Sequence, residues 1–158
     1  HSRGAAVNLL IASNVGRYVD FKLLDHELFR NPDASLERLP CSRQDIFTSR
    51  SISLVEKRVL TRFLTSCVSS SSVPDALAGV WNSPAEAYLR GEKFTDRLIM
   101  LVLDAVSLSP DPRGMSVGDV VTAVQRHVRS AGQYGDTAFI VPMYGSSEMA
   151  QAFCRCAP

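Results

Sequence analysis

The chain has 158 residues, a formal net charge of +1 and an apolar fraction of 46%. This is enough apolar material for one modest core, and the composition argues against disorder. The near-zero charge excludes a broad electrostatic footprint for nucleic acid or an anionic membrane, and no apolar run approaches the ~20 residues that span a bilayer.

The first forty residues combine a helical pattern with an extended one. Apolar side chains spaced through residues 4–18 favour a helix, with Gly16 near its end. Residues 18–23 alternate between polar and apolar side chains, which predicts a strand. The Asn-Pro-Asp triplet at 31–33 is a turn signal.

A capping signal marks the change to a helical pattern in the middle of the chain. Ser53 and Glu56 have the spacing of a capping box, in which the serine side chain accepts from a backbone amide and the glutamate reaches back. The predicted helix carries an apolar face as far as Cys67 and ends at the serine run 69–72.

Further helix signals follow. The Ser-Pro-Ala-Glu stretch at 83–86 predicts a second capping box, with proline at the first helical position. Thr95 opens a third helix, which the proline-containing segment 110–114 breaks. Residues 116–130 predict a fourth helix that stops at Gly132. The positions expected to point inward on this helix are Val117, Val120, Val121, Val124 and Val128.

After Gly135 the pattern becomes mixed again. Residues 138–141 predict a short buried strand, and Ser147 with Glu148 opens a last helix. The order predicts α/β segments at both ends and a helical block over 41–132. The expected fold class is therefore α/β with an inserted all-helical domain, in a chain that is mainly helical.

No motif supports catalysis, because the chain lacks the GxGxxG, P-loop, HExxH and GxSxG patterns. His127 is expected to be a partly exposed or hydrogen-bonded structural histidine. The spacing of Cys41, Cys67, Cys154 and Cys156 fits no zinc site, so reduced thiols and no bound metal are expected. The chain begins without methionine and ends after an apolar stretch, which is typical of an internal fragment.

Four segments together resemble one protein superfamily. RYVDFK at 17–22 resembles the RYxDFK strand of the Rab GDP-dissociation inhibitor and escort protein superfamily. EKR followed by FL at 56–64 resembles its EKRxxxxFL helix. Residues 134–145 resemble YGxxPFLxPLYG, and residues 147–155 resemble GELPQxFxR. The order and approximate spacing agree over nearly the whole chain.

Two further segments favour the escort branch of this superfamily. CSRQDIF at 41–47 resembles the escort pattern CSRxDxF, whereas the inhibitor branch has an aliphatic residue where Phe47 stands. FCR at 153–155 also resembles the escort version.

The resemblance implies a fold and a set of partners. Residues 1–40 and 133–158 would belong to a flavoprotein-like Rab-binding domain that lacks a working flavin, so no cofactor is expected. Residues 41–132 would form a helical domain that shields the Rab lipid and faces the transferase. The implied role is non-enzymatic, as an accessory component of Rab geranylgeranyltransferase. The implied partners are GDP-bound Rab GTPases with their geranylgeranyl lipid, the transferase α subunit and, transiently, membranes, but not nucleic acid. The implied location is the cytoplasm, with cycling to membranes.

The resemblance also assigns roles to pairs of residues. Phe47 and Arg58 match the Phe and Arg that contact the transferase α subunit, and Glu148 and Arg155 match a Glu and an Arg of the Rab-binding platform. From the residues alone, Phe47 is equally well a core aromatic and Arg58 a solvated helix residue. Glu148 and Arg155, seven residues apart, would share one helix face.

A loop completes the implied sites. Gln133, Tyr134, Gly135 and Thr137 match a mobile loop that helps the inhibitors contact Rab and membrane. Gln133 stands where the family usually has arginine, which puts the electrostatic role of the loop in doubt.

Three alternatives stay open at this point. The chain could come from a Rab GDP-dissociation inhibitor, which extracts and recycles prenylated Rab. It could come from a degenerate flavin-dependent oxidoreductase, which would carry a dinucleotide fingerprint upstream. It could also be a plain helical interaction domain that binds no Rab.

Overall fold

The computed structural model describes residues 1–31, 33–40, 43–68 and 75–157. The proline of the predicted turn, the Cys41-Ser42 start of the CSRQDIF motif and the serine run at 69–72 lie outside these ranges.

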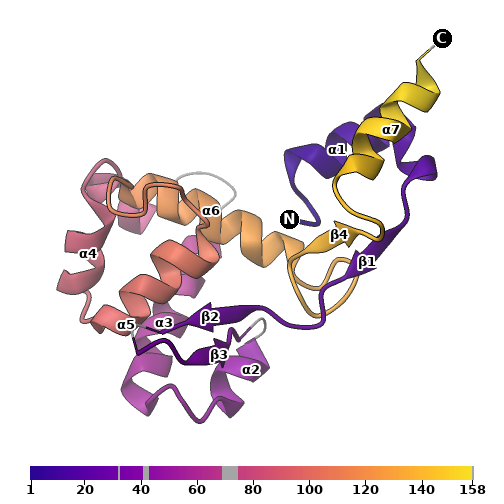
Figure 1. The fold of residues 1–158 in the computed structure, drawn as a ribbon. Coiled ribbons are helices and arrows are strands. Elements are labelled where there is room, and N and C mark those ends of the chain that lie inside the picture. The colour runs from indigo at the N-terminus through magenta and orange to yellow at the C-terminus, as the bar shows by residue number, and fades with distance from the viewer. Residues whose placement is uncertain (32, 41–42, 69–74, 158) are drawn as a thin grey trace.

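The larger part of the molecule is a block of helices (Figure 1). Its elements are α2 (Arg43–Thr48), α3 (Leu54–Val68), the 3₁₀ segment η2 (Asp75–Val80), α4 (Ala85–Gly91), α5 (Asp96–Met100), the π-helical segment η3 (Leu101–Val106) and α6 (Val117–Ser130). The long helix α6 runs from this block toward a smaller unit that contains both chain ends.

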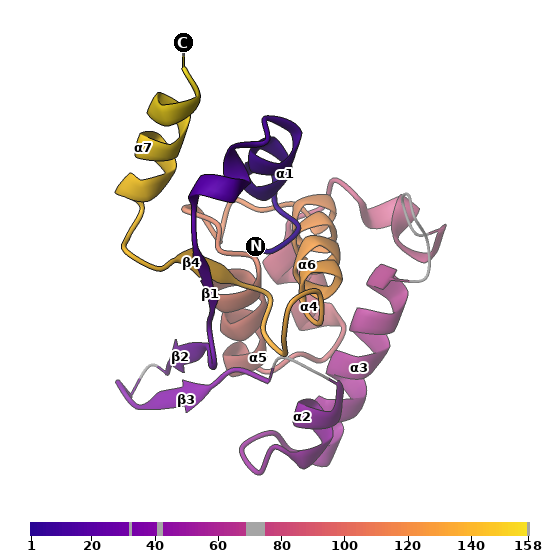
Figure 2. The same cartoon turned by 90° about the vertical axis from the view of Figure 1, so that its right-hand side faces the viewer.

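The smaller unit combines helices with a two-stranded ribbon. Its elements are α1 (Ala5–Ala12), the 3₁₀ segment η1 (Val15–Tyr18), β1 (Phe21–Leu23), β4 (Ile140–Pro142) and α7 (Ser147–Cys156). A separate hairpin of β2 (Leu28–Arg30) and β3 (Leu36–Arg38) leaves this unit and joins the helical block, where Glu37 of β3 contacts Arg97 of α5 (Figures 1 and 2).

The two ends of the chain meet in the antiparallel ribbon. Phe21 lies opposite Pro142, and Leu23 lies opposite Ile140. The predicted strand over 18–23 is shorter than expected, because Tyr18 still belongs to η1. The predicted helix over 4–18 is interrupted at Asn14, whose φ of 57° is left-handed, a conformation that asparagine tolerates better than most residues.

The described residues around the predicted turn, Asn31 and 33–35, close the β2–β3 hairpin. The amide of Asn31 donates to the Ser35 carbonyl oxygen at 2.9 Å, and the amide of Ala34 donates to the Asn31 carbonyl oxygen. The flanking strands, each three residues long, were not predicted.

The first of the two predicted capping boxes is confirmed. The Ser53 amide donates to the Glu56 carboxylate at 2.9 Å, and the Glu56 amide donates to the Ser53 hydroxyl at 3.3 Å.

The second predicted box, at 83–86, is wrong. The cap residue of α4 is Pro84, and no side chain caps the helix. The backbone here pairs with the segment before α6 instead, since the Ala85 amide donates to the Met115 carbonyl oxygen. Glu86 turns outward to an ion pair with Arg90.

The main hydrophobic core lies inside the helical block. It gathers apolar side chains from α2, α3, η2, α4, α5, η3 and α6. Four of the five valines predicted to point inward from α6 are buried, but Val128 is 37% exposed, so that prediction was wrong for this residue.

The helix predicted to open at Thr95 is confirmed. It changes register at Leu101, where a π-helical segment begins.

A second, smaller core holds the other unit together. It consists of Leu10, Val15, Val19 and Ala152, with Met149 packed against them. The helix predicted to open at Ser147 is confirmed as α7, and its residue Ala152 supplies the contact with α1 and η1.

Candidate functional site

Phe47 and Arg58 lie together on one surface of the helical block. Both line a shallow pocket, and Phe47 is 62% exposed. We call this the Phe47–Arg58 surface; its other residues are Thr61, Arg62, Thr65 and Ser66. Arg62 is engaged in an ion pair with Glu92, whereas Arg58 forms none with the described residues.

Packing explains why Phe47 faces outward. Its neighbour Ile46 is buried in the main core, so on the short helix α2 the next side chain points away. Lys57 of α3 donates to the carbonyl oxygen of Phe47 at 2.7 Å and so joins the two helices. The structure therefore excludes the reading of Phe47 as a core aromatic.

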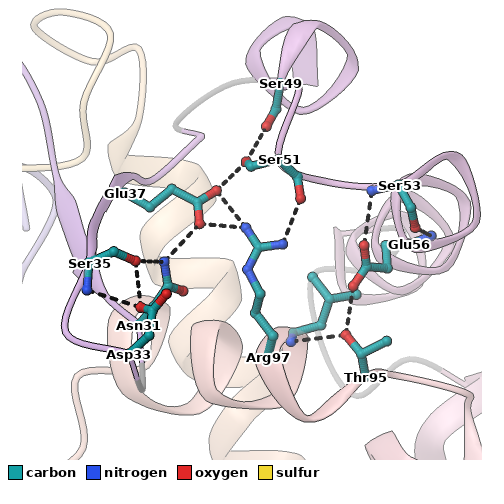
Figure 3. Close-up of polar contacts among 11 residues, drawn as sticks. Asn31, Asp33, Ser35, Glu37, Ser49, Ser51, Ser53, Glu56, Thr95 and Arg97 are labelled. Carbon is teal, nitrogen blue, oxygen red and sulfur yellow. Dashed lines mark hydrogen bonds and ion pairs between the residues drawn. The ribbon is translucent and has the colours of Figure 1, made fainter.

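A polar network around Glu37 and Arg97 was not predicted (Figure 3). Arg97 of α5 donates to the Glu37 carboxylate of β3 at 2.6 Å and to the Ser51 carbonyl oxygen at 2.7 Å. The Ser51 hydroxyl also donates to Glu37. Glu37 and Arg97 are 60 residues apart, so no local spacing pattern signals their contact.

An apolar pocket of about 130 Å³ opens between α3, η3 and α6. Its lining is aliphatic apart from His127, and it includes the half-exposed Val128. The other lining residues are Pro40, Ile46, Leu60, Leu64, Val68, Leu101, Val102, Val106, Val124 and Ala131.

His127 differs from the prediction of a partly exposed or hydrogen-bonded residue. It is buried, and its Nδ1 has no hydrogen-bond partner among the described residues. The ring packs edge-on against Phe139 at 5.7 Å and His1 at 5.9 Å, measured between ring centroids. Burial, with a smaller effect of the N-terminal amine, lowers the pKa of His127 from 6.5 to about 4. At neutral pH the imidazole is therefore uncharged.

Glu148 and Arg155 both lie on α7, as predicted. Glu148 accepts from the Tyr144 amide at 3.0 Å, which places its carboxylate over the turn before the helix. This contact fits the preference for a negative charge at a helix N-terminus. Arg155 is exposed two turns later. Both side chains therefore lie on α7, but the Glu148 carboxylate is bound to the backbone amide of Tyr144.

The loop that starts at Gln133 has one accessible side and one fixed side. Tyr134 is half-exposed, and Gln133 accepts from the side chain of Arg3 at 2.7 Å. Thr137 is buried and donates to the Leu24 carbonyl oxygen at 2.6 Å, so its side chain anchors the loop.

The described residues contain neither a metal site nor a membrane-spanning helix. No group of three or more histidine, cysteine, aspartate or glutamate side chains is arranged to hold a metal ion. No helix in the same ranges combines the length and the apolar composition that crossing a membrane requires. Cys67 is buried and Cys154 and Cys156 are exposed, all three as free thiols.

Comparison with known proteins identifies close sequence relatives. The family model described as GDP dissociation inhibitor matches residues 1–158. Rab proteins geranylgeranyltransferase component A 1 is 38% identical in Rattus norvegicus and 37% identical in Homo sapiens, over 98% of this chain. The match covers 24% and 23% of those proteins, so the chain spans about a quarter of their length. The component A protein of Drosophila melanogaster is 35% identical over 98% of the chain and 30% of its own length.

A solved structure has the same fold. The crystal structure of Rab GDI from Plasmodium falciparum matches with a TM-score of 0.75 over 97% of this chain and 38% of that chain. The sequences are 17% identical, so this likeness concerns the fold alone.

Proposed function

The chain belongs to the GDP dissociation inhibitor family, and we propose that it is part of a Rab escort protein, which binds GDP-bound Rab and presents it to geranylgeranyltransferase. The similarity to component A proteins over 98% of the chain supports this branch of the family. Because the chain spans about a quarter of those relatives, the carrier activity is proposed for the whole protein.

The exposure of Phe47 beside Arg58 is the observation that carries the proposal. An aromatic side chain that is 62% exposed next to a guanidinium free of ion pairs with the described residues is typical of a binding hot spot. We assign this surface to the α subunit of the transferase. The protein would act there as a non-enzymatic accessory component.

The apolar pocket is the proposed place for the geranylgeranyl lipid of Rab. Its aliphatic lining suits a hydrocarbon, and the uncharged His127 adds no ionic group at neutral pH. Its volume of about 130 Å³ lies below the roughly 300–1,000 Å³ of ordinary ligand sites. Lipid binding would therefore require α3, η3 and α6 to move apart.

The smaller unit is the proposed part of the Rab-binding domain. Glu148 and Arg155 on α7 would contribute to the Rab platform, with Tyr134 as the accessible residue of the neighbouring loop. We further propose that this domain is flavoprotein-like and carries no flavin. The protein would act in the cytoplasm and cycle to membranes with its cargo.

A comparison of two affinities tests the proposal in the complete protein. Phe47→Ala should weaken binding to the transferase at least tenfold, because truncating a hot spot costs about 2 kcal/mol or more. Affinity for GDP-loaded Rab should stay within twofold. Leu54→Ala is the matched control, because Leu54 is an exposed apolar residue of the same helical block that does not line the Phe47–Arg58 surface.

Each other outcome points to one alternative. Retained Rab binding with unchanged transferase affinity would indicate a GDP-dissociation inhibitor instead. Flavin absorbance in the purified protein would indicate an oxidoreductase. Failure of the unmodified protein to bind any Rab would leave a plain helical interaction domain.

A further inference from the structure

The network of Glu37, Ser51 and Arg97, called here the Glu37–Arg97 clamp, joins three segments distant in sequence. Glu37 comes from the β2–β3 hairpin, Ser51 from the loop between α2 and α3, and Arg97 from α5 (Figure 3). The side chains of Glu37 and Arg97 are 19% and 28% exposed, so solvent screens their interaction only in part.

Hydrogen bonds within and beside the clamp stabilise the negative charge of Glu37. Burial opposes ionisation, but hydrogen bonds from Ser51, Arg97 and Asn31 outweigh it, so the pKa of the Glu37 carboxyl lies below its usual value. The carboxylate is therefore ionised at neutral pH, and its ion pair with Arg97 is formed.

The clamp fixes the loop that follows Phe47. Arg97 holds the backbone of this loop through the Ser51 carbonyl oxygen, and Glu37 holds the Ser51 hydroxyl. The Ser49 and Ser51 hydroxyls are 2.9 Å apart, which extends the contacts to the residue after α2.

Helix α2 depends on such outside support. It has six residues, and isolated helices shorter than about 12–15 residues are marginal in water. On one side the buried Ile46 and the bond from Lys57 hold it to the block. At its C-terminal end the clamp holds the chain that leaves the helix, through Ser49 and Ser51.

We propose that the Glu37–Arg97 clamp is a positioning device that holds Phe47 beside Arg58 before the transferase binds. This inference rests on the proposed function of the Phe47–Arg58 surface. Side chains already fixed in their bound arrangement lose less conformational freedom on association, and this raises affinity. The clamp residues themselves need not touch the partner.

A partly buried ion pair is weak evidence for added stability. Desolvation of the two charges offsets much of their attraction, so apolar replacements are often equally stable. The Arg90 ion pairs with Glu86 and Asp96, which are more exposed and lie on α4 and α5, provide the comparison. They share the chemistry of the clamp but do not hold the loop after Phe47.

A double-mutant cycle on the complete protein tests the proposal. Glu37→Gln should weaken transferase binding about tenfold, while Rab-GDP affinity changes little. In a Phe47→Ala background, the same substitution should add less than a twofold loss, because Glu37 acts through Phe47. Arg90→Gln is the matched control and should leave transferase affinity unchanged.

Several outcomes would overturn the positioning role. The first is an unchanged transferase affinity for Glu37→Gln. The second is a loss of Rab affinity as large as the loss of transferase affinity. The third is a tenfold loss of transferase affinity when Glu37→Gln is added to Phe47→Ala. If Phe47→Ala alone has no effect, the proposed function itself is wrong. If Glu37→Gln fails to fold, Ser51→Ala replaces it, because this variant removes only one hydroxyl from the clamp. Ser51→Ala should lower transferase affinity about threefold, and it should add little further loss in the Phe47→Ala background.

Discussion

Ile46 and Phe47 are adjacent on a short helix and have opposite environments. Successive residues of a helix are rotated by about 100°, so burial of one side chain turns the next outward. Ile46 joins the main core and leaves Phe47 62% exposed. Residue type alone does not decide which of the two apolar side chains is buried, and only the family resemblance favoured exposure of Phe47.

His127 shows a similar choice at the end of α6. The positions three and four residues after the buried Val124 are His127 and Val128, and helical spacing admits both to the inner face. The histidine is buried because Phe139 and His1 pack on its ring. These rings come from segments far away in the sequence, so the valine pattern could not indicate them.

Stability of the chain should fall as the pH is lowered from 7 to 5, because of His127. The folded state takes up a proton only near pH 4, whereas the unfolded state does so near 6.5, so acid favours unfolding. The expected loss is about 2 kcal/mol in the free energy of unfolding, measured by urea denaturation at each pH. His127→Leu is the control and should flatten this part of the curve. An equal slope in both proteins would contradict the assignment.

The starts of the helices show how far capping boxes can be predicted from sequence spacing. Ser53 and Glu56 form the predicted box because both residues are free to turn toward the helix start. The same spacing fails at 83–86, where the backbone pairs with the segment before α6. The unpredicted box at α6 uses Ser116 with Asp119, where aspartate replaces the glutamate of the usual pattern.

Two serine substitutions should therefore differ in their effect on stability. Ser116→Ala removes the side chain that accepts from the Asp119 amide at 3.2 Å and should lower the free energy of unfolding by about 1 kcal/mol. Ser83→Ala should change it by less than about 0.5 kcal/mol, because no side chain caps α4. Thermal denaturation followed by circular dichroism compares the two. Equal losses would mean that Ser83 does cap its helix.

The whole molecule combines a strong core with a weak one. The helical block was predicted from helix periodicity, which depends on neighbouring residues only. The pairing of Phe21–Leu23 with Ile140–Pro142 joins segments more than 100 residues apart, and three-residue strands carry too little alternation to reveal their partners. The order of elements predicted that both ends of the chain belong to one α/β unit. The register of β1 with β4 and the β2–β3 hairpin depend on tertiary contacts and could not be predicted from the order.

Hydrogen exchange should separate the two units of this chain. Amides of α6 and η3 lie in the main core and should exchange most slowly, whereas α1 and α7 are held by a core of four buried residues. Exposed apolar residues on α1, such as Leu9 and Ile11, add surface that nothing in the described residues covers. Mass spectrometry of peptides from each helix would measure the difference, and equal protection of α1 and α6 would contradict it. In a protein with the length of the relatives, further chain packed on α1 should slow exchange there and leave α6 unchanged, because α6 is already buried in its own block.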